Sequence, residues 1–463
     1  MERPSRAQLE QLSKDELIGL VERLFDELER VRSAVDQVRR DVERLKQPKA
    51  TSRNSSQPPS RDQKTDTPPR RRKRRGARPG HARMERAWVA EPTQVIVAHP
   101  AQCACGADLQ AVAAESVERR QLTEIPLIEP IVIETHRHTV QCPACGRQQA
   151  GVLPSGLEPG RAFGPRLEAA VVYLQHQQHV SYERTVLILR ELFAVDMSAG
   201  GLAAISARAG LAAEPQVAAI QAQIRQSAVV GSDETGARVE GHTQWEWVFR
   251  TDQAELHVIR PSRGADVIQA VMGVARVGTW VCDCWAPQLQ APAARFQLCL
   301  AHQIRNLQGL RERCPHLRWA QEMQALFREA IHLGKRRQRL SAAGYQRRVT
   351  ELERSLRRLI DRPVQNRKAR ALVKRYRKHR DHLLVFLRDP MVPPHNNACE
   401  RSLRPSVVHR KVIGSFRSTW GADAFAALAS IAGTAKLRGQ SVFQAFVELM
   451  GPPVLHYLDA HSA

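Results

Sequence analysis

Two aspartates stand where carboxylates could share a metal ion. Asp233 follows the apolar run 228–232, and Asp283 follows a second short apolar run, 278–282. Such runs predict buried strands, each of which would end on an acid. Carboxylate oxygens are hard ligands that suit Mg²⁺ and Mn²⁺. If the two strands are neighbours, these acids would form a divalent metal site.

Four cysteines form a second set of candidate ligands. Cys103 pairs with Cys105, Cys142 pairs with Cys145, and a glycine follows each pair. Four thiolates suit a tetrahedral structural site, so we predict one Zn²⁺ in a module over residues 88–155. The first pair has one intervening residue where two are usual. The alternative is four separately packed, reduced cysteines, with a hairpin between the pairs (Ile125, Leu127, Ile131, Ile133) that needs no metal.

The elements around the two aspartates predict how they are positioned. Gln244–Arg250 and Glu255–Arg260 have the pattern of strands, and a helix is expected over about Gly264–Val274. The resulting order is strand, strand, strand, helix, strand, with acids on the first and fourth strands. This is the order of the ribonuclease-H-like fold, an α/β fold with a mixed sheet flanked by helices. We assign it to residues 227–450.

Composition points to a polyanionic partner. The 463 residues include 70 Lys plus Arg against 47 Asp plus Glu, a formal net charge of +23. This length predicts two or more domains. No run approaches the roughly 20 apolar residues that span a bilayer, and residues 1–9 lack the apolar stretch of a signal peptide. We therefore expect a soluble cytoplasmic protein without membrane association, in which the nine cysteines stay reduced. Charge alone does not distinguish DNA from RNA.

Residues 8–47 have the pattern of a coiled-coil helix. Ser13 and Glu16 form a capping-box signature at its start, and Pro48 would end it. Apolar residues alternate at spacings of four and three: Leu17, Val21, Leu24, Leu28, Val31, Val35, Val38, Val42 and Leu45. This heptad pattern predicts self-association as a homo-oligomer. The alternative is a lone amphipathic helix packed on its own domain.

Residues 48–87 are rich in Ser, Pro, Gln and Arg, and are expected to form a disordered basic linker. Within it lies an unbroken basic run: Arg70, Arg71, Arg72, Lys73, Arg74 and Arg75. A flexible run of this kind neutralises phosphates without reading sequence, so we predict that it clamps DNA. The alternative is a tract that only aids solubility.

Residues 156–226 have a helical pattern, with helices expected near Pro165–His179, Tyr182–Phe193 and Ser198–Ala209. The break at 193–198 resembles the turn of a helix-turn-helix, which would make this a DNA-binding segment. Few side chains in the third helix could read a base edge. Structural packing of three short helices is therefore the alternative.

Together these features resemble the transposases of the insertion sequence 66 family, over nearly the whole chain. The order of the coiled coil, basic linker, cysteine module, helical segment and split core is that of the family. The resemblance rests on four motifs: 231–236 (GSDETG), 282–287 (CDCWAP), 299–305 (CLAHQIR) and 393–405 (PPHNNACERSLRP), with Arg410 and Lys411 following.

The resemblance implies a DDE catalytic triad of Asp233, Asp283 and Glu400 that binds two Mg²⁺ or Mn²⁺ ions. Such an enzyme would cleave and transfer DNA strands at insertion-sequence ends by a two-metal phosphodiester mechanism. Asn396 is a plausible N-cap that places Glu400 one turn inside a helix. The alternative for Glu400 is a surface ion pair with Arg404. The implied partners are double-stranded DNA, at the transposon ends and the target, and accessory transposition proteins. The implied location of this protein is the bacterial nucleoid.

Further residues near the acids are candidates for contact with DNA: His302, Asn397, Arg401 and Arg404. A basic helical insertion is expected at about 310–390, and residues 451–463 form a tail. The same residues are compatible with two other functions. One is a DNA-binding regulator without catalysis, and the other is a ribonuclease-H-like nuclease that does not join strands.

Overall fold

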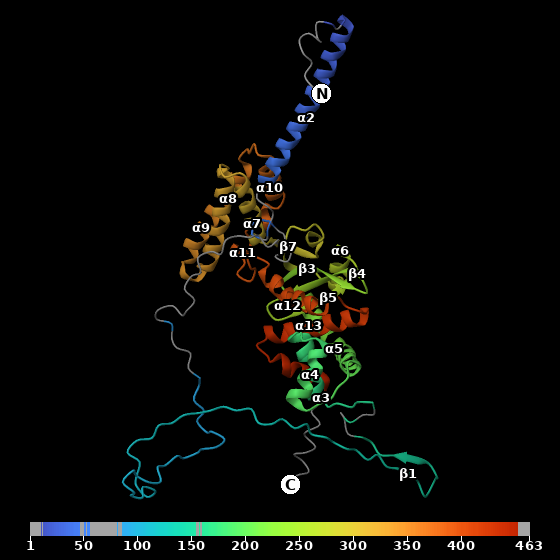
Figure 1. Ribbon diagram of the computed structural model, residues 1–463, viewed down its shortest axis with the longest axis vertical. Helices are drawn as coiled ribbons and strands as arrows, with labels where there is room; N and C mark the ends of the chain where they lie inside the picture. The colour runs from blue at the N-terminus through green and yellow to red at the C-terminus, as the bar shows by residue number, and fades with distance from the viewer. Residues whose placement is uncertain are drawn as a thin grey trace.

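The computed structural model describes residues 11, 13–46, 51, 53–55, 81, 86–153, 157 and 160–451. The predicted DNA-clamping run 70–75 lies outside the described residues, as do most of the predicted linker and residues 452–463. The described chain is a mixed α/β structure, with a sheet and its helices in the centre and further helices beyond it (Figure 1).

Five strands form the central sheet: β3 (Val229–Val239), β4 (His242–Arg250), β5 (Glu255–Arg260), β6 (Val277–Cys282) and β7 (Ala293–Leu298). Their order across the sheet is β5-β4-β3-β6-β7. The first three strands are antiparallel neighbours, whereas β6 and β7 run parallel to β3. The mixed sheet predicted from the sequence is therefore confirmed.

Strand β3 is longer than its apolar start indicates. We expected it to end on Asp233, but it continues to Val239 because β4 pairs with it along its whole length. Its parallel pairing with β6 stops at Gly231, opposite Val281. Beyond this point β3 and β6 are no longer paired, and the aspartates of both strands lie where the pairing ends.

The main helices pack around this sheet. On β4, Val248 contacts Cys399 and Leu403 of α12 (Asn397–Ile413). The neighbouring Trp247 and Phe249 point to the opposite face by strand alternation and belong to the main core. α6 (Ala265–Met272) makes the predicted crossover between β5 and β6, with Val267 and Ile268 buried in that core.

The helical segment before the sheet shares this core. It comprises α3 (Pro165–Val172), the π-helix η2 (Tyr173–Gln177), α4 (Tyr182–Phe193) and α5 (Ala199–Gln226). The helix expected near 165–179 thus changes to a π-helix in its second half. The segment's buried apolar side chains belong to the main hydrophobic core of the sheet. Side chains of α13 (Thr419–Leu437) and α14 (Val442–Met450) lie in the same core.

The third helix of this segment is much longer than predicted. We expected it to stop near Ala209, immediately before Gly210, but it continues to Gln226. A Cβ at Gly210 would lie 2.6 Å from the Cβ of Ala424 on α13. The glycine therefore serves close helix packing, and its helix lies against α13 and β5. This placement favours the packing alternative over a free recognition helix.

Helices occupy the stretch between β7 and α12, where we expect an insertion at about 310–390. This stretch contains α7 (Leu300–Arg313), α8 (Arg318–Lys335), α9 (Ala342–Asp361), α10 (Arg367–Lys378) and α11 (Val385–Arg388). In α9, one face buries Tyr345, Val349, Leu352, Leu356 and Ile360, so the arginines lie on the other faces. Helices α8 and α9 lie away from the strands, whereas α11 contacts the edge strand β7 (Figure 1).

The long N-terminal helix, α2, spans Lys14–Lys46. Its predicted capping box is confirmed, because the backbone N–H of Ser13 donates to Glu16 at 2.8 Å and the backbone N–H of Glu16 donates to Ser13 Oγ at 3.3 Å. Part of the predicted linker is also ordered. Asn54 is 5% exposed, and its side chain donates to Glu312 of α7 at 2.5 Å.

Candidate active site

Three acids from three elements lie close enough for their charges to interact. Asp233 is on β3, Asp283 directly follows β6, and Glu400 is in the first turn of α12. The charges of Asp283 and Glu400 raise the pKa of Asp233, and the charge of Glu400 raises the pKa of Asp283. The structure thus brings together the three residues that the sequence indicates as a triad.

The site concentrates negative charge in a partly buried setting. Burial raises the pKa of Asp233 well above its usual value, and the charges of Glu234 and Asp283 raise it further. Burial also raises the pKa of Asp283, against a hydrogen bond from the Trp285 backbone and the charges of Arg263 and Arg375. Protein groups therefore do not fully neutralise these acids, which favours a cation among them.

Glu234, beside Asp233, was not among the residues that we predicted. Its side chain accepts from Nη2 of Arg263 at 2.8 Å and from Nε2 of Gln288 at 2.8 Å. The Arg263 guanidinium lies between two indoles, 4.5 Å from the Trp245 ring centre and 4.3 Å from that of Trp285. Gln288 and Trp285 belong to the loop after β6, and Glu234 belongs to β3. Their contacts with Glu234 and Arg263 therefore attach this loop to β3 and fix the position of Asp283 relative to Asp233.

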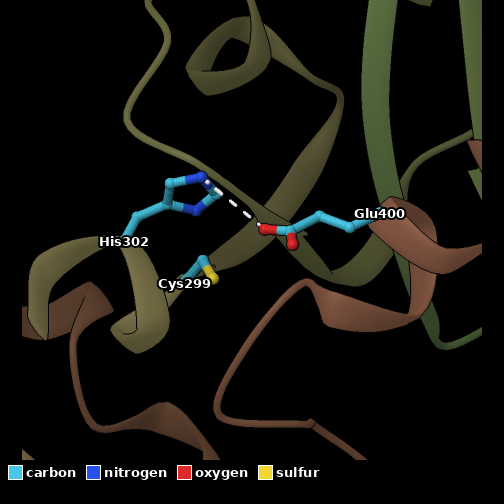
Figure 2. A group of neighbouring side chains, drawn as sticks. All are labelled: Cys299, His302 and Glu400. Carbon is cyan, nitrogen blue, oxygen red and sulfur yellow. Dashed lines mark ion pairs between the residues drawn. The ribbon is translucent and has the colours of Figure 1, made fainter. Parts of the chain in front are cut away.

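Glu400 faces α7 and makes no surface pair with Arg404. Its carboxylate lies 3.6 Å from Nε2 of His302 and 3.4 Å from Nη2 of Arg305. Cys299 precedes the same helix, and Figure 2 shows its thiol and the imidazole directed toward Glu400. Spacings of three residues along 299, 302 and 305 put these side chains on one helix face, a signal that the sequence contained.

The start of α12 is joined to the sheet by close contacts. Asn396 begins the helix as predicted, but no side-chain cap forms. Instead its Nδ2 donates to the carbonyl of Ser232 at 2.7 Å. A Cβ at Gly231 would lie 2.9 Å from the Cys399 sulfur, so only glycine allows this approach. The Asn396 amide therefore holds α12 against β3, which brings the charge of Glu400 within range of Asp233.

The family model described as "Transposase IS66 family" matches residues 160–424, more than half of the chain. The chain belongs to this family of transposases. The match includes all three acids, α7 and the start of α12. Residues 1–87 match a second model, a family of unknown function (DUF6444). A search of curated proteins gives no match.

Membership of the IS66 transposase family identifies a DNA-processing enzyme whose partner is DNA. Two of the predicted DNA contacts, Arg401 and Arg404, are exposed on α12. Asn397 is partly buried, and its Oδ1 has no partner among the described residues. His302 differs from these three, because it contacts Glu400. None of the described helices is long and apolar enough to cross a membrane.

Behind the candidate active site of this transposase, a buried ionic network connects α12 to the sheet. His257 of β5 is 3% exposed and lies 2.9 Å from Glu246 and 3.1 Å from Glu255. Two side chains of α12 complete the network, because Ser406 and Arg410 each donate to Glu246 at 2.6 Å. The network therefore fixes the part of the helix that follows Glu400.

The protonation of His257 predicts a loss of stability at alkaline pH. Burial alone would lower its pKa, but the hydrogen bonds and charges of Glu246 and Glu255 raise it to about 9. Its contribution is complete below the unfolded value near 6.5 and is lost as pH rises through about 9, a change of about 3 kcal/mol. We therefore expect the thermal unfolding midpoint to fall as pH rises from about 6.5 to about 9, and to level off above that.

A substitution separates this effect from other alkaline titrations. His257→Gln should lower the unfolding midpoint at pH 7 and should show a weaker fall between about pH 6.5 and 9 than the unmodified protein. Unfolding curves followed by circular dichroism over this pH range test both expectations. Equal pH dependence in the two proteins would contradict the role of the imidazolium.

The cysteine module has the turns that its glycines predict. Gly106 and Gly146 have φ of +93° and +71°, and backbone hydrogen bonds close both turns. In each pair, hydrogen bonds from the second cysteine's backbone lower the pKa of the first thiol, Cys103 or Cys142. All four cysteines are described, yet the two pairs do not meet as one group of ligands.

The alternative of a hairpin between the pairs is wrong. Residues 115–138 contain no strand, and the short strands β1 (Thr139–Gln141) and β2 (Gln148–Ala150) instead flank the second pair. Ile125 and Leu127 are 76% and 87% exposed. These apolar side chains have no packing partner that would stabilise a hairpin.

Proposed function

We propose that this transposase cleaves DNA and joins DNA strands with a metal site formed by Asp233, Asp283 and Glu400. The observation that carries this proposal is the convergence of three acids from β3, β6 and α12 on a place where burial and mutual repulsion raise the pKa of both aspartates. Their oxygens are the ligands that Mg²⁺ and Mn²⁺ prefer. Two such ions, when bound, would activate the attacking oxygen and stabilise the leaving oxygen.

The residues of the chain would prepare this site for DNA. The three carboxylates, held on different elements, would fix the ions relative to the strand. Arg263 and Arg375 reduce the repulsion between the acids, as their effect on the pKa of Asp283 indicates. Exposed Arg401 and Arg404 would bind phosphates of the same strand beside Glu400.

A ribonuclease-H-like identity of the core is part of the proposal. It is supported by the strand order β5-β4-β3-β6-β7, with three antiparallel strands followed by two parallel ones. The acids on the first and fourth strands of this sheet lie where the parallel pairing ends. Ligands of α/β sheets often bind at such strand ends.

Strand transfer distinguishes this proposal from its two rivals. A labelled, precut transposon end is incubated with plasmid DNA, Mg²⁺ and the protein. A transposase joins the end to the plasmid, whereas a nuclease only shortens it and a regulator leaves it unchanged. Joined product should appear with Mg²⁺ and disappear when the metal is chelated.

We also propose that Cys103, Cys105, Cys142 and Cys145 bind one structural Zn²⁺ when the ion is present. The two turns with their hydrogen-bonded sulfurs support this role. Purified, reduced protein should contain about one zinc per chain for this module, and Cys142→Ser with Cys145→Ser should remove it. Elemental analysis checks the zinc content. Equal zinc in both proteins would contradict the proposal.

A further inference from the structure

Helices α7 and α12 bring three different metal-ligand types together. The sulfur of Cys299, a ring nitrogen of His302 and a carboxylate oxygen of Glu400 all lie within 4.8 Å of one another (Figure 2). Among the described residues, no other set of three or more histidine, cysteine and acidic side chains meets this limit. The Asp233 and Asp283 oxygens therefore lie outside this compact group.

The donors of this group select a different ion from the aspartates. Mg²⁺ favours oxygen ligands, whereas thiolate and imidazole suit Zn²⁺ and Co²⁺. One thiolate, one imidazole and one carboxylate give three protein ligands, which leaves a fourth position open. A bound zinc-type ion would thus use Glu400 together with two residues that Mg²⁺ has little affinity for.

The backbone holds these ligands in place without an ion. Cys299 is 0% exposed, and its N–H donates to the carbonyl of Cys282, at the end of β6, at 2.8 Å. Its sulfur accepts the N–H of Asn396 at 3.1 Å. The competing cation is Arg305, but its contacts with Glu400 are 3.4 and 3.5 Å, longer than the usual 2.7–2.9 Å of charge-assisted hydrogen bonds. An incoming divalent ion can displace it at low cost.

We propose that Cys299, His302 and Glu400 bind one zinc-type divalent ion, which competes with the catalytic Mg²⁺ for Glu400. Binding itself needs only these three side chains. The consequence, inhibition of Mg²⁺-dependent cleavage by Zn²⁺, rests on the proposed function. Two separate measurements therefore test the two parts.

The first measurement is titration of the reduced, full-length protein with Co²⁺, followed by the absorption of the sulfur-to-cobalt charge-transfer band. Cys299→Ser and His302→Gln should each lose one bound cobalt, with affinity at this site reduced at least about tenfold. Cys314→Ser is the matched control, because Cys314 lies at the other end of α7. It should keep the full cobalt content, and so separates this site from general thiol binding.

Cobalt bound equally by the unmodified protein and by both variants would overturn the proposal. The unfolding midpoint of each variant shows whether it is folded, and the use of two different substitutions keeps the test valid if one of them fails to fold.

The second measurement compares cleavage in Mg²⁺ with and without added Zn²⁺. Each protein's rate with Zn²⁺ is divided by its own rate without Zn²⁺. Zn²⁺ should inhibit the unmodified protein strongly and Cys299→Ser less. Equal inhibition of the two proteins would exclude competition at this site.

The Asp233→Asn variant keeps the two hypotheses distinguishable. It retains Cys299, His302 and Glu400, so it should bind cobalt with the same charge-transfer band even where cleavage is lost. If Asp233→Asn still cleaves DNA, the catalytic triad is wrong while the cobalt result stands. If Cys299→Ser keeps all its cobalt, the zinc-type site is wrong while the triad stands.

Discussion

Asp233→Asn should abolish Mg²⁺-dependent DNA cleavage while DNA binding stays nearly unchanged. The substitution removes one oxygen ligand from the site where β3 and β6 separate. Metal ions contribute several kcal/mol to such transition states, so we expect cleavage to fall at least about a thousandfold. Binding should change by less than about threefold, because the variant alters one charge in a chain with a net charge of +23.

A labelled transposon end measures both quantities, by product formation on a denaturing gel and by a mobility shift. Asp381→Asn is the matched control, because its side chain is 81% exposed and lies in the helical insertion. This control should cleave normally. Cleavage by Asp233→Asn at the rate of the control would rule out the triad.

Local sequence patterns were sufficient to find the two aspartates. Asp233 and Asp283 follow short apolar runs, and alternation in 244–250 identified the strand beside β3. These signals depend on neighbouring residues only. The end of β3 was missed because it depends on pairing with β4, which the apolar run does not record.

Contacts between distant segments were harder to predict. Asn396 has the residue type of a helix cap, but its side chain reaches Ser232, 164 positions away. The ion pair of Glu234 with Arg263 likewise depends on how the loop after β5 folds over the sheet. Gly210 has the type of a helix stop, and only the approach of α13 explains why it lies inside a helix. In each case the tertiary partner decides between two uses that the local sequence allows.

For the N-terminal helix, the partner that the local sequence does not reveal lies outside the chain. Along α2, the apolar side chains of the heptad pattern remain exposed, for example Leu24 at 54%, Leu28 at 65% and Val38 at 62%. A continuous apolar stripe of this kind is unfavourable in water unless another helix covers it. We therefore propose that a second copy of α2 covers it, which would bring two active sites to the two ends of one element.

Replacing Leu24 and Leu28 with Asp should abolish this self-association. Each carboxylate would be buried without a partner in the seam, and a combined cost of at least about 3 kcal/mol would weaken the dimer more than a hundredfold. Deleting residues 1–47 should act likewise. Nicking of a single transposon end should be less affected than coupled processing of two ends, because only the second reaction needs two chains.

Gly19→Asp with Ser33→Asp is the matched control for charge. Both positions lie on the outer face of the heptad pattern, and a side chain at Gly19 would meet nothing within 4 Å. Light scattering of all four proteins should be done at about 1 M salt, where screening over about 3 Å removes long-range effects of the basic residues. The control should keep the mass of the unmodified protein, while the seam variant and the deletion should be monomers. An unmodified protein that is itself monomeric would refute the coiled coil, because the exposed stripe would then have no partner of its own kind.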